Sequence, residues 1–140
     1  MKNRILTGII LTAVLCTSMF IVSGCGKDEE ADAPIISPIE ITLSIDYPDK
    51  ASWEDVKDVT FKLEEDSSVL EAIQLYCNVN EMPMLVETTG KTLYGINGIN
   101  NGDIDSDRSW KFYVNGKTPR KSESKIILED GDTLAWYYAE

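Results

Sequence analysis

The stretch that decides the fold is Trp110-Lys111-Phe112-Tyr113-Val114-Asn115-Gly116, followed downstream by Leu128-Glu129-Asp130-Gly131-Asp132-Thr133-Leu134-Ala135-Trp136-Tyr137. The first run predicts a strand from Trp110 to Val114, and Asn115-Gly116 predicts a tight turn directly after it. The second run predicts a last strand from Thr133 to Tyr138. In both strands, alternate side chains lie on opposite faces. Several of these rings must therefore form a core, and the others remain available for contact.

Working outward, the same alternation begins the folded part of the chain. Apolar and polar residues alternate from Ile39 to Tyr47, and again at Val59, Phe61 and Leu63, which predicts two opening strands. A helix follows, because Ser68 and Glu71 form the S-x-x-E pattern of a capping box. Its apolar stripe consists of Val69, Ala72, Ile73, Tyr76 and Cys77.

The remaining segments predict short strands: Met84 to Glu87, Lys91 to Ile96, and Lys125 to Leu128. Asn97-Gly98 and Asn100-Asn101-Gly102 are turn signals between them. Two strands, one helix and then several short strands predict an α+β fold with the helix across one face of a sheet.

Residues 1–24 are typical of a secretory signal: Lys2 and Arg4 precede an apolar run, which ends in small residues before Cys25. Val22-Ser23-Gly24-Cys25 resembles the lipobox of bacterial lipoprotein precursors. The resemblance implies cleavage before Cys25, lipidation of its thiol and an extracytoplasmic protein anchored to the cell membrane. An ordinary signal peptide and an uncleaved anchor are the alternatives.

Two further regions follow the signal. Residues 25–38 carry the lipidated cysteine and an acidic, proline-containing run, which predicts a flexible tether. Residues 39–140 are long enough for one hydrophobic core, and we expect one domain there. After the loss of Cys16 and lipidation of Cys25, Cys77 is the one remaining thiol. Cys77 therefore has no internal disulfide partner, and its place on the helix stripe predicts a buried core residue.

The charge of the chain argues against anionic partners. Its formal net charge is −11 with no histidine, and loss of the signal removes two further positive charges. Nucleic acid and anionic lipid surfaces would be repelled, so we expect no nucleic-acid partner. No Cys/His metal spacing exists. Asp103, Asp105 and Asp107 begin like a calcium loop, but Arg108 replaces the required glycine and Val114 the final acid. A solvated acidic turn is the favoured interpretation, and a weak cation site is the alternative.

Catalysis is not expected, because no histidine, nucleophile motif or phosphate loop is present and no pair of carboxylates stands out. Exposed tyrosine and tryptophan rings would instead suit non-catalytic binding of an organic ligand, a saccharide or a protein.

Four segments together resemble the transcobalamin C-terminal-like domain family, bacterial relatives of the β-domain of cobalamin carriers. These segments are Ser68 to Ile73, Tyr94 to Ile99, Trp110 to Gly116, and Asp130-Gly131-Asp132 with Trp136. They occur in the family's order and extend the resemblance over nearly all of residues 39–140. The resemblance implies a β-grasp-like mixed sheet packed on a single helix. In the animal carriers the ligand lies between this domain and a large helical domain, for which these residues leave no room.

The resemblance also implies a ligand, cobalamin or a related corrinoid, which the lipoprotein could deliver to a membrane importer. The residues expected on the ligand face are Tyr94, Asn97, Trp110, Tyr113, Trp136 and Tyr138, with Asn97 as hydrogen-bonding partner. Each of them could instead be structural, and for Trp110 and Trp136 the core interpretation is at least as strong. The alternative function is a surface module that binds protein or cell-wall glycan and has no small-molecule pocket.

Overall fold

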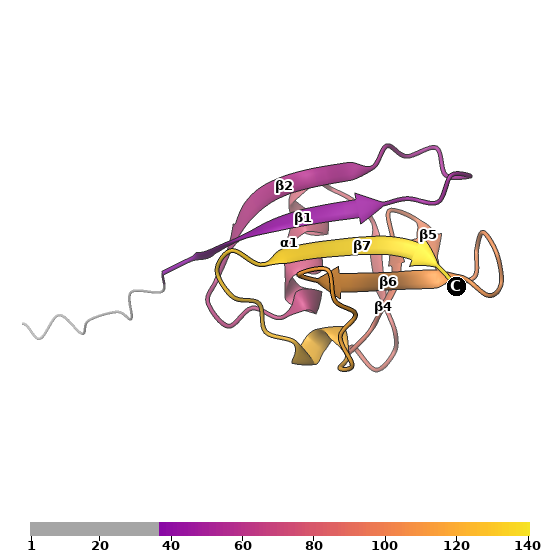
Figure 1. Cartoon of the computed structure of the whole chain (residues 1–140). Helices are drawn as coiled ribbons and strands as arrows, with labels where there is room; N and C mark the ends of the chain where they lie inside the picture. Colours follow the sequence, from indigo (N-terminus) through magenta and orange to yellow (C-terminus); the bar gives the residue numbers. More distant parts are fainter. Residues whose placement is uncertain (1–36) are drawn as a thin grey trace, which may run out of the picture. The chain divides into compact units, whose positions relative to one another are not determined.

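The structure, a computed structural model, describes residues 37–140 (Figure 1). The predicted signal, Cys25 and nearly all of the predicted tether lie outside these residues. Within them, no helix is both long and apolar enough to cross a membrane. The elements in chain order are β1 (Ile39–Asp46), β2 (Val56–Leu63), α1 (Val69–Val79), β3 (Met84–Val86), β4 (Leu93–Ile96), β5 (Ile99–Asn100), β6 (Ser109–Val114), the 3-10 helix η1 (Glu123–Lys125) and β7 (Thr133–Ala139).

The main layer is a mixed four-stranded sheet in the order β2-β1-β7-β6. The first and last strands, β1 and β7, lie parallel at its centre, with Leu43 opposite Leu134. β2 pairs antiparallel with β1, and β6 pairs antiparallel with β7, so β2 and β6 form the two edges. The expected α+β class, with a mixed sheet and one α-helix, is confirmed for residues 37–140.

Helix α1 begins where the capping box predicts. The Ser68 hydroxyl accepts a hydrogen bond from the Glu71 backbone N–H, and the Glu71 carboxylate accepts one from the Ser68 N–H at 2.7 Å. The Ser68 backbone N–H and, to a lesser extent, the Ser68 hydroxyl donate hydrogen bonds to the Glu71 carboxylate, and these bonds hold the pKa of Glu71 below its usual value. The predicted stripe is confirmed at Val69, Ala72, Ile73 and Cys77, which are fully buried. The helix thus covers one face of the main sheet (Figure 1).

Aromatic rings form much of the core between the helix and the sheet. The Trp110 ring meets Tyr47 and Tyr138 edge to face, at centroid distances of 5.8 and 5.5 Å. Phe112 packs against Trp136 at 5.0 Å. These contacts agree with the predicted alternation, because the rings of Trp110, Phe112, Trp136 and Tyr138 all lie on the helix-facing side of β6 and β7. Edge-to-face ring pairs contribute to stability beyond the apolar surface area that they bury.

A β-bulge interrupts the edge strand β2. The register advances two residues on β1, from Leu43 to Ile45, but three on β2, from Val59 to Val56. Asp58 adopts a positive φ of 48° there. Its N–H donates to the Ser44 hydroxyl at 3.2 Å, and that hydroxyl lies within 3.2 Å of the Asp58 carboxylate. The bulge bends β2 at one end and leaves Val59 to Leu63 in regular pairing.

The connection between β6 and β7 agrees with one prediction and differs from another. Asn115 and Gly116 do form a turn, with φ values of 51° and 71°. The predicted strand Lys125 to Leu128 is wrong: its start belongs to η1, and only Ile127 makes a single bridge, to Ser68. The physical reason is that this segment bonds to the chain just before the helix. Leu128 N–H donates to the Ser67 carbonyl at 2.9 Å.

A second, three-stranded sheet has the order β3-β4-β5. The predicted strands Met84 to Glu87 and Lys91 to Ile96 are confirmed as the shorter β3 and β4. β5 was not predicted as a strand, and it pairs with β4 through the Asn97-Gly98 turn. This small sheet contacts β6 through β4.

The two core tryptophans differ in their hydrogen bonds, and we therefore expect their replacement to lower the free energy of unfolding by different amounts. Trp110 Nε1 donates to the Ile99 carbonyl at 2.8 Å, whereas Trp136 Nε1 finds no acceptor among residues 37–140. Trp110→Phe would remove a buried hydrogen bond, while Trp136→Phe would remove an unpaired donor. We therefore expect Trp110→Phe to lower the free energy of unfolding by about 1–3 kcal/mol more than Trp136→Phe. Urea denaturation of both variants measures the difference, and equal or reversed losses would contradict this account of the core.

Candidate functional site

Three connections meet at one end of the main sheet, which we call the loop end. They are residues 47–55 between β1 and β2, the Asn97-Gly98 turn, and residues 101–108 between β5 and β6. Lys50 Nζ lies 3.5 Å from an Asp105 carboxylate oxygen, which joins the first connection to the third. The Asn97 side chain is close enough to affect the ionisation of Tyr47. β1 and β7 both run toward this end (Figure 1).

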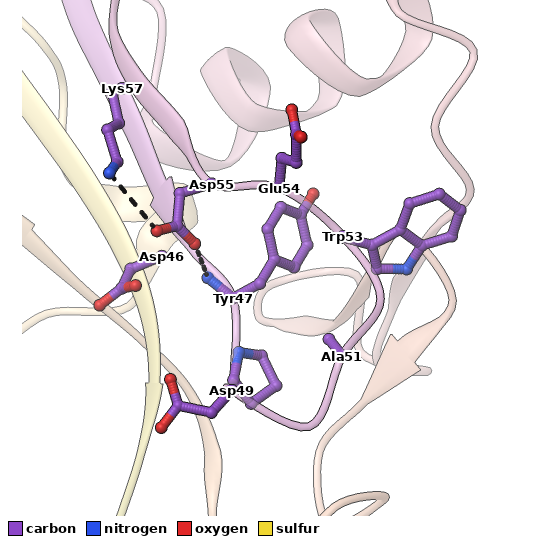
Figure 2. A pocket seen from close by; sticks show the side chains of 9 residues that line it. Asp46, Tyr47, Asp49, Ala51, Trp53, Glu54, Asp55 and Lys57 are labelled. Atoms are coloured by element: carbon purple, nitrogen blue, oxygen red, sulfur yellow. Dashed lines mark hydrogen bonds and ion pairs between the residues drawn. The ribbon is translucent and has the colours of Figure 1, made fainter.

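The first connection and the adjoining strand ends line an open pocket of about 520 Å³. Figure 2 shows its lining side chains, among them the Trp53 indole, which stands out from the loop and is 53% exposed. The volume falls in the range of small-molecule sites. The lining residues are Asp46, Tyr47, Pro48, Asp49, Ala51, Trp53, Glu54, Asp55 and Lys57.

The local sequence explains the shape of this connection. Pro48 has no N–H for the strand ladder, and the Ala51 N–H donates to its carbonyl at 2.7 Å, which turns the chain. The Asp55 carboxylate then accepts a hydrogen bond from the Tyr47 N–H at 3.0 Å. This bond joins the two ends of the connection across the base of the pocket (Figure 2).

The pocket is predominantly acidic. Four carboxylates line it, and its one lysine, Lys57, lies 3.9 Å from an Asp55 oxygen. Nearby Lys50 is paired with Asp105 instead. The lining therefore repels anions and favours ligands that carry a positive charge or many hydrogen-bond donors. The exposed Trp53 face adds a surface for stacking or for a cation.

Tyr47 forms the inner wall, and its side chain is only 6% exposed. Burial raises the pKa of its phenol to about 12, and the nearby Asn97 side chain opposes this rise. The hydroxyl therefore stays protonated in the physiological range. It makes no hydrogen bond within residues 37–140. The Asn97 side chain is the polar group that lies beside this buried hydroxyl.

Three of the six residues expected on the ligand face lie in the core. Trp110, Trp136 and Tyr138 are all buried, and their rings pack in the contacts described above. The Tyr138 hydroxyl also donates to the Asn100 carbonyl at 3.2 Å. Their positions give them a packing role, because the inward face of β6 and β7 must cover the helix. An outward ligand-contact role has no support from these positions.

The other three are accessible but do not form one face. Tyr94 is exposed on β4, and Tyr113 is half-buried on the sheet face opposite the helix. Tyr113 stacks on Tyr137 at 4.5 Å, and burial, with Tyr113, raises the pKa of Tyr137 to about 12. Asn97 alone belongs to the loop end. Its φ of 51° is one that asparagine tolerates, so the turn itself also explains this residue.

The residues that line the pocket are not among those predicted from the sequence to bind a ligand. Trp53 was visible as the one large ring in a polar connection that follows Pro48, and that isolation was the available signal. Tyr47 ends the alternating pattern that predicts a half-buried first strand, and this pattern does not mark it as a pocket residue. The pocket depends on the path of the loop between them, and no periodic pattern encodes that path.

The acidic run 103–107 is partly used by the fold. The Asp103 carboxylate accepts the Asn100 N–H at 2.8 Å, and Asp105 lies within ion-pair distance of both Lys50 and Arg108. Asp107 lies 3.2 Å from the Ser106 hydroxyl. Among residues 37–140, no group of three or more acidic, cysteine or histidine side chains is arranged to hold a metal ion.

Residues 66–140 match a protein family described as a domain of unknown function (DUF4430). This match covers more than half of the chain, so the chain belongs to that family. No curated protein matches it.

Solved structures share the fold, among them the following two. One is haptocorrin in complex with Cbi, with a TM-score of 0.59 and 14% identity over 76% of this chain and 26% of the haptocorrin chain. The other is a protein from Ruminococcus gnavus ATCC 29149, provisionally described as metal binding. Its TM-score is 0.50, with 16% identity over 73% of this chain and 97% of that one. This chain thus spans about a quarter of haptocorrin. At these identities the likeness is one of fold, and at that level it supports the resemblance to cobalamin carriers.

Cys77 provides a test of the described core. The thiol is fully buried, and burial raises its pKa to about 11. At pH 8 only about one thiol in a thousand is then ionised, and thiolate is the reactive form. We expect native protein to leave Cys77 unmodified by iodoacetamide at pH 8, while protein in urea is fully modified. Peptide mass spectrometry resolves Cys77 from the other cysteines, and rapid native modification would contradict the burial.

Proposed function

We propose that this chain is a membrane-anchored, non-catalytic binding protein whose β-grasp-like domain captures a small molecule. Cobalamin or a related corrinoid is the candidate ligand, and delivery to a membrane importer is the candidate purpose. The observation that carries the proposal is the open pocket at the loop end, with the exposed Trp53 indole beside acidic groups.

The shape of the pocket supports binding to one side of a large, flat ligand. It is open rather than enclosed, and its walls are the Trp53 ring and the short loop around Pro48 and Ala51. A corrin ring presents a broad face with peripheral amide groups. Carboxylates such as Asp49 and Glu54 could accept hydrogen bonds from those amides, and the indole could cover part of the ring.

The comparison supports the choice of candidate. Haptocorrin, which shares this fold, was crystallised with Cbi, a corrinoid. The present chain corresponds to a quarter of that protein, so a complete site could require a partner protein. The acidic loop end would favour a corrinoid that bears a net positive charge over one with an exposed phosphate.

The absence of catalysis is part of the proposal. The chain has no histidine. Among residues 37–140, two carboxyl groups have a shifted pKa, and neither faces the pocket: Glu71 caps α1, and the raised pKa of Glu123 reflects its burial beside β6. The lining thus resembles a recognition surface more than an acid–base pair.

The membrane anchor rests on the sequence alone. A diacylglyceryl group on Cys25 would hold the protein at the outer side of the membrane, with residues 26–38 between the lipid and the domain. The negative charge of the domain would keep it away from anionic lipid head groups.

The alternative is a surface module that binds protein or cell-wall glycan. The observation that favours it is the outward Tyr113–Tyr137 stack, a flat aromatic face of the kind that contacts saccharide rings. If this alternative holds, Tyr113→Ala should reduce binding to cell-wall fragments, and corrinoids should have no effect.

Titration with cobinamide and with cyanocobalamin tests the leading proposal. We expect either corrinoid, on binding, to quench the tryptophan fluorescence of the detergent-purified chain, with Trp53 the ring at the proposed site. Trp53→Ala should weaken binding about tenfold, since one ring contact contributes roughly 1.4 kcal/mol. Binding by the variant is followed by corrinoid absorbance.

The matched control is Leu85→Ala, which also truncates an exposed apolar side chain but lies outside the pocket. It should bind as the unmodified chain does. If millimolar corrinoid produces no response, the isolated chain does not bind this ligand. If both variants lose affinity equally, Trp53 is not part of the binding site.

Mass spectrometry of the protein from bacterial membranes tests the anchor. We expect Cys25 as the first residue, with a mass increase that corresponds to a diacylglyceryl group. Cys25→Ser should leave the signal attached and remove the lipid. An unmodified Cys25 in the mature protein would contradict lipidation.

A further inference from the structure

The edge strand β2 and helix α1 form an apolar groove, which shares no lining residue with the pocket at the loop end. Its volume is about 470 Å³, and its lining residues are Val59, Phe61, Lys62, Leu75, Tyr76, Val79 and Asn80. Val59, Leu75 and Val79 are all exposed, with 72% of Val79 accessible. A cluster of exposed aliphatic side chains beside an unpaired strand is typical of an interaction surface.

The free edge of β2 also presents backbone groups. On β1, the Thr42 N–H donates toward β7, to the Asp132 carbonyl at 2.9 Å. Thr42 therefore does not bond to its partner on β2, Thr60. In antiparallel pairing, the N–H and C=O of Thr60 must then point away from β1, into the open edge. The same alternation places the backbone groups of Lys62 at the edge.

The sequence of this edge is complementary to itself. If two copies of β2 pair antiparallel about Thr60, Lys62 of one copy lies opposite Asp58 of the other, and Phe61 lies opposite Val59. The pairing is symmetric, so each contact occurs twice. Asp58 and Thr60 lie on the sheet face opposite the helix, because Asp58 bonds to Ser44 and Thr60 pairs with Thr42. The charged pairs thus form on one face and the apolar pairs on the other.

We propose that this chain forms a homodimer through β2, with Thr60 on the two-fold axis. The two four-stranded sheets become one continuous sheet of eight strands. A two-fold axis perpendicular to that sheet places both helices on the same face. Leu75 and Val79 of each copy then meet their counterparts across the axis and cover the apolar groove.

Two features limit the strength of this dimer. The bulge directs the Asp58 N–H to Ser44, so the ladder between copies is short. The large negative charge of each chain adds long-range repulsion. We therefore expect a reversible dimer that strengthens as salt screens the net charge, although salt also weakens the Lys62–Asp58 pairs.

Sedimentation equilibrium of the full chain in a density-matched detergent tests the proposal, at about 0.05 and 0.5 M salt. The expected result is a monomer–dimer equilibrium that shifts toward dimer at the higher salt. The double variant Leu75→Gln/Val79→Gln, which keeps charge and helix propensity, should weaken dimerisation at least tenfold. The control Leu85→Gln/Ile127→Gln changes two exposed apolar residues elsewhere and should not. A monomer at every concentration, or equal effects in both double variants, would overturn the proposal.

Cysteine crosslinking tests the register, in a full chain with Cys16 and Cys25 replaced by serine. Thr60→Cys should form a disulfide-linked dimer on mild oxidation, because directly opposed residues in a hydrogen-bonded antiparallel pair have Cα atoms about 5.5 Å apart. Lys62→Cys alone should not, since its counterpart lies four positions away along the ladder. Mixing Lys62→Cys with Asp58→Cys should restore crosslinking. Crosslinking by Lys62→Cys alone, or none by Thr60→Cys, would exclude this register.

Discussion

The parallel pairing of β1 with β7 is the constraint on which the rest of the structure depends. It joins the first and last strands of the domain at the centre of the sheet, with Leu43 beside Leu134 and Ile45 beside Trp136. Both strands are buried on their helix-facing side, so their register fixes which rings enter the core. Forming this long-range pair also closes a loop of nearly the whole domain, which carries a cost in chain entropy.

Once that pair is set, the positions of the functional surfaces follow. β1 ends at the loop end, where Pro48 turns the chain and Asp55 holds the turn closed. The outer partner of β1 is β2, whose other side pairs with no strand among residues 37–140. The pocket and the apolar groove are therefore both products of the β1–β2 hairpin, one at its tip and one along its edge.

Much of the fold was predictable because its local signals agree. Alternation predicted β1, β6 and β7, and Ser68 with Glu71 predicted the start of α1. The segment Lys125 to Leu128 misled because its continuous apolar run, Ile126-Ile127-Leu128, is typical of a buried strand, while its hydrogen bonds go to the chain around Ser67. The site was less predictable. Trp110 and Trp136 stand out in the sequence as large rings, but the face of the sheet on which they lie depends on the register of the strands. Trp53 lines the pocket only because of the path that its loop takes in the folded domain.

The central place of β1 has a mechanical consequence. The residues that precede Ile39 enter the domain through a strand that is bonded on both sides, to β2 and to β7. A pull on the chain from that side acts along the strand and loads both ladders in shear, so that their hydrogen bonds resist together rather than opening one by one. β1 is thus a firm point of attachment, and a force applied before Ile39 would reach the centre of the sheet without first peeling an edge.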